Sequence, residues 1–126
     1  MDIKIRRTEE FVPKWNKNDK DKNPIVFKLK YLTVSEHEDC RSLTPIKLDI
    51  NGKKVSGGEL IADPKKIFSY SVMEITNLTT IDEDDKKVDI RSAEDMLTCQ
   101  SQELVGLFFE VTSHILAMSK KVNSKN

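Results

Sequence analysis

The chain has 126 residues and a mass of 14.5 kDa, which is typical of one domain able to bury about two-thirds of its unfolded surface. Hydrophobic residues make up 37% of it and charged residues 33%, so we expect a folded protein with a modest core and exclude a wholly disordered one. No apolar segment approaches the roughly 20 residues that cross a bilayer, and the opening residues lack the apolar core of a signal peptide. We therefore expect a cytosolic protein without a membrane segment.

Charge is balanced overall, with 21 basic and 21 acidic residues, but it is unevenly placed. Residues 1–30 hold nine Lys or Arg and five acids, whereas residues 74–95 hold eight acids and three bases. Such asymmetry can steer partners, although solvated charge explains it more simply. The basic N-terminal segment allows nucleic-acid binding as an alternative, but its own acids dilute the positive field.

Residues 1–24 are predicted to form an extended arm followed by a polar loop. The arm holds a short apolar patch of Phe11, Val12 and Trp15. A large aromatic residue in a polar segment usually docks somewhere, so we expect Trp15 to anchor the arm by burying its ring. The alternative is that Trp15 is a hot spot for a partner protein.

The segment that follows the arm has the pattern of a half-buried strand. Alternate residues from Ile25 to Tyr31 are apolar, while lysines occupy the opposite face. Thr33 and Glu36 then have the spacing of a capping box, which predicts a short helix from about Val34 to Arg41.

A hairpin is expected next. Ile46, Leu48 and Ile50 alternate before Asn51-Gly52, the dipeptide best suited to a tight hairpin turn. The return strand over residues 53–56 is weak, and Gly57-Gly58 is expected to end it in a flexible loop.

An amphipathic helix is predicted over about 63–78, with Asp63 as its cap and Pro64 as its first residue. Its apolar side would hold Ile67, Phe68, Val72, Ile75 and Leu78. A second hairpin should pair residues 79–81 with 88–91 around an acidic turn. Ser92 and Asp95 then favour a short helix through Leu97.

The most apolar segment of the chain predicts a long helix over about 101–119, capped by Ser101. On a helical wheel a core stripe contains Leu104, Leu107, Phe108, Val111, Ile115 and Met118. A second apolar stripe beside it contains Val105, Phe109 and Leu116, with Gly106, Glu110, Ser113 and Ala117 opposite. This apolar surface is wider than one core contact needs.

Two explanations of the second stripe stay open. The helix can be covered on two sides within its own domain, or Val105, Phe109 and Leu116 can meet another protein. We take these three residues, together with Trp15, as the candidate protein-binding residues.

No catalytic, cofactor-binding or metal-binding motif is found. The sequence lacks GxGxxG, GxxxxGK[ST], GxSxG and HExxH, and neither His37 nor His114 lies in a recognisable nucleophile pattern. The clusters "EHEDC" and "DEDDKKVD" lack the spacing of a metal site and of a calcium loop. Cys40 and Cys99 form no CxxC pair, so we expect reduced thiols, with a disulfide left open. We expect a protein that is not an enzyme and uses no cofactor.

Together these elements predict an α+β fold with a small, mainly antiparallel sheet. Two principal helices, about 63–78 and 101–119, would pack with the sheet, accompanied by one or two short helices. Residues 25–119 would form the single domain, and residues 120–126 a disordered tail.

Four segments, in order, carry a family resemblance: "IKIRRTEEFVPKWNKNDKDKNPIVFKLKYLT", "DPKKIFSYSVMEITNL", "DIRSAEDML" and "ELVGLFFEVTSHILAMS". Together they resemble the small tail assembly chaperones of long-tailed bacteriophages and prophages. The resemblance implies a protein of the bacterial host cytoplasm that is absent from the virion. It would coat the tape measure protein and help recruit tail tube protein, without a cofactor.

The resemblance leaves homo-oligomerisation possible. In many such families a longer product arises by ribosomal frameshifting, and Lys120-Lys121 could be encoded by a slippery run of adenines. The first alternative function is a structural tail or head-tail component that oligomerises. The second is a small nucleic-acid-binding protein.

Overall fold

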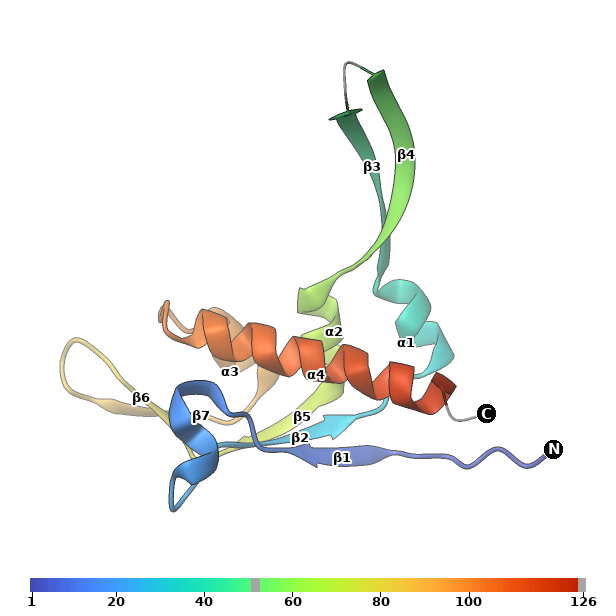
Figure 1. The fold of residues 1–126 in the computed structure, drawn as a ribbon. Coiled ribbons are helices and arrows are strands. Elements are labelled where there is room, and N and C mark those ends of the chain that lie inside the picture. The colour runs from blue at the N-terminus through green and yellow to red at the C-terminus, as the bar shows by residue number, and fades with distance from the viewer. Residues whose placement is uncertain (51–52, 125–126) are drawn as a thin grey trace.

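The computed structural model describes the backbone of residues 1–50 and 53–124, and the side chains of residues 1–41 and 62–118. It has the expected α+β fold (Figure 1). The central element is a three-stranded antiparallel sheet of β1 (Thr8–Phe11), β2 (Val26–Lys30) and β5 (Val72–Thr76), in the order β1-β2-β5. β1 therefore joins the sheet, although residues 1–24 were predicted to lie outside the folded domain.

Two helices pack over one face of this sheet, α2 (Pro64–Ser71) and α4 (Leu104–Ser124). Phe27 and Leu29 of β2 point toward the helices and are fully buried, and so is Phe68 of α2. Leu107 and Val111 of α4 complete the centre of this core. The opposite side of β2 carries exposed Lys28, as the alternation of the sequence predicts.

The loop between β1 and β2 forms a short 3-10 segment, η1 (Trp15–Lys20), held by the buried side chain of Asn18. The Asn18 amide donates to the backbone carbonyls of Pro13 at 2.9 Å and of Ile25 at 3.0 Å. The backbone N–H of Ile25 donates to Asn18 Oδ1 at 2.7 Å. One side chain thus fixes both ends of a loop that the sequence presents only as a polar run.

Helix α1 (Val34–Asp39) has the predicted capping box, with the Glu36 N–H donating to Thr33 Oγ1 at 3.1 Å and the Thr33 N–H donating to Glu36 Oε1 at 2.9 Å. A long hairpin of β3 (Arg41–Ile50) and β4 (Lys53–Ala62) follows and extends away from the sheet (Figure 1). The return strand was expected to end at Gly57-Gly58, but it continues through both glycines to Ala62. The turn residues Asn51 and Gly52 lie outside the described residues.

The predicted helix over 63–78 is correct only in its first half. Asp63 caps α2 as expected, but the helix ends at Ser71 and the chain continues as β5. Val72 and Ile75 are both buried because the pairing with β2 shifts between Lys28 and Leu29, which is a β-bulge. A bulge turns two strand residues three positions apart to the same face, and this mimics helical spacing.

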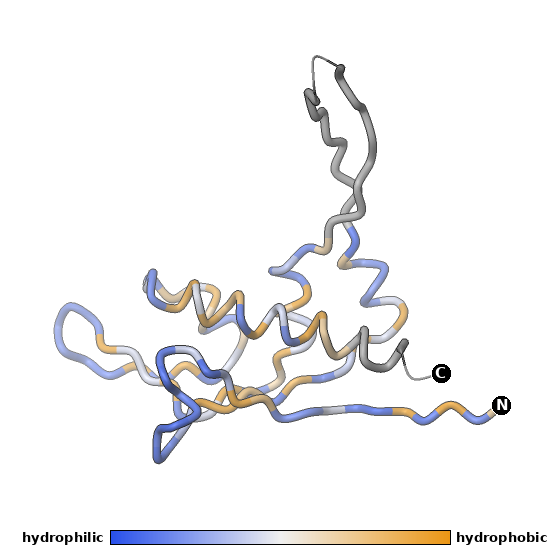
Figure 2. Tube along the Cα trace, in the orientation of Figure 1, coloured by the Kyte–Doolittle hydropathy of each residue, from blue (hydrophilic) through white to orange (hydrophobic). Residues whose placement is uncertain are grey.

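The remaining short elements agree with the sequence. β6 (Leu78–Ile81) pairs with β7 (Lys87–Ile90), and Ser92 caps α3 (Ala93–Thr98) by accepting from the Asp95 N–H at 3.1 Å. Figure 2 shows how hydrophilic residues fill the turn between β6 and β7. Helix α4 begins at Leu104 and continues to Ser124, so the predicted end near Ser119 is wrong and the expected tail begins within the helix. Among the described residues, no helix is both long and apolar enough to cross a bilayer.

Candidate protein-binding surface

Helix α4 has a buried and an exposed apolar stripe, as the helical wheel predicts. Leu104, Leu107, Val111, Ile115 and Met118 are buried against the sheet and α2, and Phe108 lies half-buried at the edge of this core. In contrast, Val105, Phe109 and Leu116 are 51%, 57% and 40% exposed. Nothing in the described part of the chain covers this second stripe.

The exposed face of α4 carries no charge between Leu104 and Met118. Besides the three large apolar residues, the exposed positions there are Gly106, Ser113 and Ala117. We call these six residues the α4 face. A helix surface without charge is unusual in a chain that is 33% charged, because solvent-facing helix positions normally carry Lys, Arg, Asp or Glu. The α4 face is therefore suited to contact another apolar surface.

The two ionisable side chains of this stretch, Glu110 and His114, are engaged by the N-terminal arm. The backbone N–H of Lys14 donates to Glu110 Oε2 at 2.6 Å. His114 Nε2 lies 3.3 Å from Glu9 Oε2, and its ring stacks on Phe11 with centroids 3.9 Å apart and planes at 9°. The arm thus covers a third side of α4, which the helical wheel places opposite the apolar stripes.

Trp15 completes this contact at the N-terminal end of α4. It is partly buried against the core, as expected of an anchor. A Cβ atom placed on Gly106 would lie 3.3 Å from Trp15 Nε1 and 3.4 Å from Cδ1, closer than most side chains tolerate. Gly106 therefore lets the indole approach the helix backbone. Trp15 meets α4 one residue from Val105, beside the exposed stripe.

Phe109 is connected to the core by a series of aromatic contacts. Phe27 of β2 contacts Phe68 of α2 at a ring-centroid distance of 6.4 Å, and Phe68 contacts Phe108 at 5.1 Å. Phe108 in turn contacts Phe109 edge-on at 5.4 Å. Phe108 thus restrains the exposed ring of Phe109, and a restrained aromatic residue loses little conformational entropy when it binds a partner.

A small apolar depression lies beside the exposed stripe, where α3 meets the start of α4. Its volume is about 180 Å³, and it is lined by Met96, Leu97, Cys99, Ser101, Leu104, Val105 and Phe108. Val105 belongs both to the depression and to the α4 face, so the two form one continuous apolar surface. A single apolar side chain of a partner could fill this space.

A second, larger cavity of about 1160 Å³ lies between η1, the β6–β7 hairpin and the start of α4. Its described lining holds seven acids and no Lys or Arg: Asp21, Asp82, Glu83, Asp84, Asp89, Asp95 and Glu103. Several of these carboxylates stabilise local backbone. Asp82 Oδ1 accepts from two turn N–H groups at 2.8 and 2.9 Å, and Asp95 accepts from the Arg91 N–H at 3.1 Å. Asp82 and Asp95 thus have structural roles.

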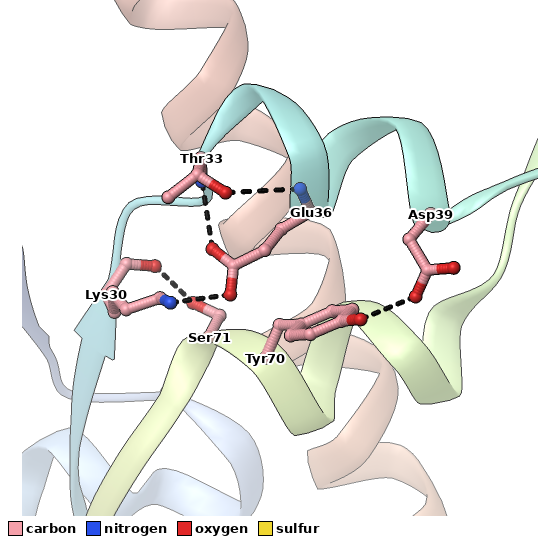
Figure 3. Close-up of polar contacts among 6 residues, drawn as sticks. All are labelled: Lys30, Thr33, Glu36, Asp39, Tyr70 and Ser71. Carbon is pink, nitrogen blue, oxygen red and sulfur yellow. Dashed lines mark hydrogen bonds and ion pairs between the residues drawn. The ribbon is translucent and has the colours of Figure 1, made fainter.

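Polar side chains also gather around α1, at the base of the β3–β4 hairpin (Figure 3). Lys30 Nζ lies 2.6 Å from Glu36 Oε2, and the Ser71 hydroxyl donates to the Lys30 carbonyl at 2.7 Å. Partial burial tends to raise the pKa of Glu36, but the bond and charge of Lys30 and the bonds of Thr33 outweigh it and lower that pKa. The ion pair thus ties α1 to the end of β2.

A second contact ties α1 to α2. The Tyr70 hydroxyl donates to Asp39 Oδ2 at 2.5 Å, and Lys66 Nζ lies 3.4 Å from Asp39 Oδ1. The hydrogen bond from Tyr70, and then the charge of Lys66, lower the pKa of Asp39, and the same bond raises the pKa of Tyr70. Because the Asp63 N–H also donates to the Cys40 carbonyl at 2.7 Å, these contacts fix the base of the hairpin.

The acidic cluster "EHEDC" does not converge on one point. Glu36 faces Lys30, Asp39 faces Tyr70, and the Cys40 side chain is buried. Burial raises the pKa of the Cys40 thiol, with the charge of Asp39 acting in the same direction. Both cysteines are free, and the described residues contain no group of three side chains able to hold a metal ion.

No family model, curated protein or solved structure matches this chain. The family resemblance therefore depends on the four sequence segments alone.

Proposed function

We propose that this protein is a tail assembly chaperone that holds an apolar helical segment of the tape measure protein against the α4 face. The observation that supports the proposal is the exposed, uncharged face of a helix whose other sides are covered by the core and by the arm. An exposed apolar face lowers the solubility of a protein, so its presence favours a binding role.

The geometry of the face favours a helical client. Val105, Phe109 and Leu116 follow one another at spacings of four and seven residues, and this places them along one line of a helix. The small side chains of Ser113 and Ala117 lie beside this line and allow a second helix to approach closely. An amphipathic client helix could place its own apolar residues between the line of large apolar side chains and the small side chains beside it.

The size of the face fits a transient complex. A half-exposed phenylalanine offers only about 100 Å² of apolar surface, whereas stable interfaces bury about 800 Å² on each partner. The α4 face and the adjoining depression alone would therefore give a complex that dissociates readily. A chaperone has to release its client during assembly, and weak apolar contact serves that need.

Co-expression with the tape measure protein of the same phage or prophage tests the proposal. The expected result is that the tape measure protein stays soluble with the wild-type chain and precipitates with the Phe109→Asp variant. Ser113→Asp, which adds the same charge elsewhere on the face, should weaken the effect less, and Lys28→Asp on the opposite side of the sheet should leave it intact. Equal solubility of the client with and without this chain would refute the chaperone role. Recovery of this chain in purified virions would favour a structural component.

A further inference from the structure

The outer edge of β1 offers unpaired backbone groups. Within the described residues, β1 pairs only with β2 and ends the sheet on that side. The Tyr31 N–H donates to the Arg7 carbonyl at 3.0 Å, so Arg7 directs its backbone groups toward β2. Because these directions alternate along a strand, Thr8 and Glu10 direct their N–H and C=O groups outward. The edge is thus ready to accept another strand.

The sequence of this edge is complementary to itself in charge. Residues 5–11 read Ile-Arg-Arg-Thr-Glu-Glu-Phe, with two bases before Thr8, two acids after it and a large apolar residue at each end. When such a strand meets a second copy of itself in the antiparallel direction, each base faces an acid. The acids that dilute the positive field of the arm are therefore placed where they can pair with the bases of a second copy.

We propose that two copies of the chain associate through their β1 edges, with Thr8 of each copy opposite Thr8 of the other. In this register Arg6 faces Glu10, Arg7 faces Glu9 and Ile5 faces Phe11, and each pair occurs twice about the two-fold axis. The two three-stranded sheets join into one antiparallel sheet. Arg6, Thr8 and Glu10 direct their backbone groups outward, so the pairs Thr8–Thr8, Arg6–Glu10 and Glu10–Arg6 form two bonds each, about six inter-chain backbone hydrogen bonds in all.

Charge and side-chain direction exclude the neighbouring registers of this strand pair. A shift by two residues in one direction places Arg7 opposite Arg7, and a shift in the other direction places Glu9 opposite Glu9. Like charges directly opposite one another destabilise a strand pair, and a shift by one residue turns the apolar face toward the wrong side. The Thr8 register is therefore the one that the sequence specifies.

The exposed N-terminal residues support the same partner. Ile5 is 78% exposed. When the pairing extends the strand through residues 5–7, alternation places Ile5 on the face that carries Phe11. Phe11 already stacks on His114 of α4, so the Ile5 of a second copy would extend an existing apolar contact. Pairing also covers an open sheet edge, which otherwise invites uncontrolled strand addition.

Sedimentation equilibrium on the purified chain, at low salt and over a range of concentrations, tests the proposal. We expect a dimer, with Arg6→Glu and Glu10→Arg each weakening association about tenfold or more, since two ion pairs become two repulsions. An equimolar mixture of these two variants should dimerise like the wild type. In the mixed dimer the acids at positions 6 and 10 of one chain face the bases at positions 10 and 6 of the other. Lys4→Glu, which changes a charge outside these ion pairs, is the matched control.

A backbone variant separates pairing from folding. Thr8→Pro removes one outward N–H but no bond to β2, so it should abolish dimerisation while far-UV circular dichroism and thermal unfolding stay close to wild type. A chain that is monomeric at every concentration would overturn the proposal and would point to a strand from another protein. A dimer that survives Arg6→Glu and Thr8→Pro but dissociates with Phe109→Asp would also overturn it, because the α4 face would then be the interface.

Discussion

Replacing each of the two adjacent phenylalanines of α4 by alanine should show which of them stabilises the core and which belongs to the binding surface. Phe109 is 57% exposed, so less than half of the roughly 2.5 kcal/mol available from burying a phenylalanine is gained there. That leaves about 1 kcal/mol from burial and about 0.5 kcal/mol from the edge contact with Phe108. Alanine recovers about 0.5 kcal/mol through its higher helix propensity. We expect Phe109→Ala to reduce the free energy of unfolding by about 1 kcal/mol.

Phe108→Ala should cost more, although the two residues are neighbours of the same type. The Phe108 ring packs against Phe68 and the core, so its removal leaves a cavity as well as exposing apolar surface. Losses of about 3 kcal/mol are usual for such a substitution. Phe108→Asp would unfold the domain, because a carboxylate would enter that space without a partner. Phe109→Asp should leave the domain folded.

Urea denaturation followed by far-UV circular dichroism measures both unfolding free energies. The fluorescence of Trp15, the single tryptophan, provides a second probe at the contact between arm and helix. In parallel, capture of the proposed client, the tape measure protein, should fall at least about tenfold for Phe109→Ala, as expected of an aromatic hot spot. If both substitutions destabilise the protein by the same amount, the second stripe is part of the core and the α4 face is not a binding surface.

Three further predictions concern other parts of the fold. Asn18→Ala should lower the unfolding free energy by about 3 kcal/mol, because both the N–H and the carbonyl of Ile25 lose their hydrogen-bond partner. A loss below about 1 kcal/mol would contradict this. Gly106→Val should push the indole of Trp15 from the helix and shift its emission to longer wavelength, whereas an unchanged spectrum would show that the ring does not rest there. The pKa of Glu36 is lowered on folding, so its contribution to stability is present above its ordinary value of 4.5 and is lost as the pH falls through the folded value. Glu36→Gln should therefore flatten the acid limb of a stability-against-pH curve, and an unaltered acid limb would refute the ion pair.

Local signals in the sequence predicted the elements that depend on near neighbours. The capping box at Thr33, the cap at Asp63 and the hairpin of β6 and β7 each involve residues a few positions apart, and all three are present. The division of α4 into a core stripe and an exposed stripe was also predictable, since it follows from helical geometry alone.

The errors arise where distant segments decide the structure. Val72 and Ile75 have helical spacing, and only the bulge against β2 shows that they belong to a strand. The arm was expected to lie outside the domain because nothing in its composition indicates that Glu9 and Lys14 meet α4 across about a hundred residues. The return strand was predicted too short because Gly57-Gly58 has low strand propensity, which the ten residue pairs of β3 and β4 override.

The contact between the arm and α4 has a consequence for the order of folding. Lys14 and Glu110 are 96 positions apart, and Glu9 and His114 are 105 apart, so these contacts close loops that contain most of the chain. On a ribosome, β1 emerges about a hundred residues before its partner helix. The arm can pair with β2 in the meantime, but it gains its full set of contacts only after α4 has docked. We therefore expect docking of this arm onto α4 to be a late step in folding.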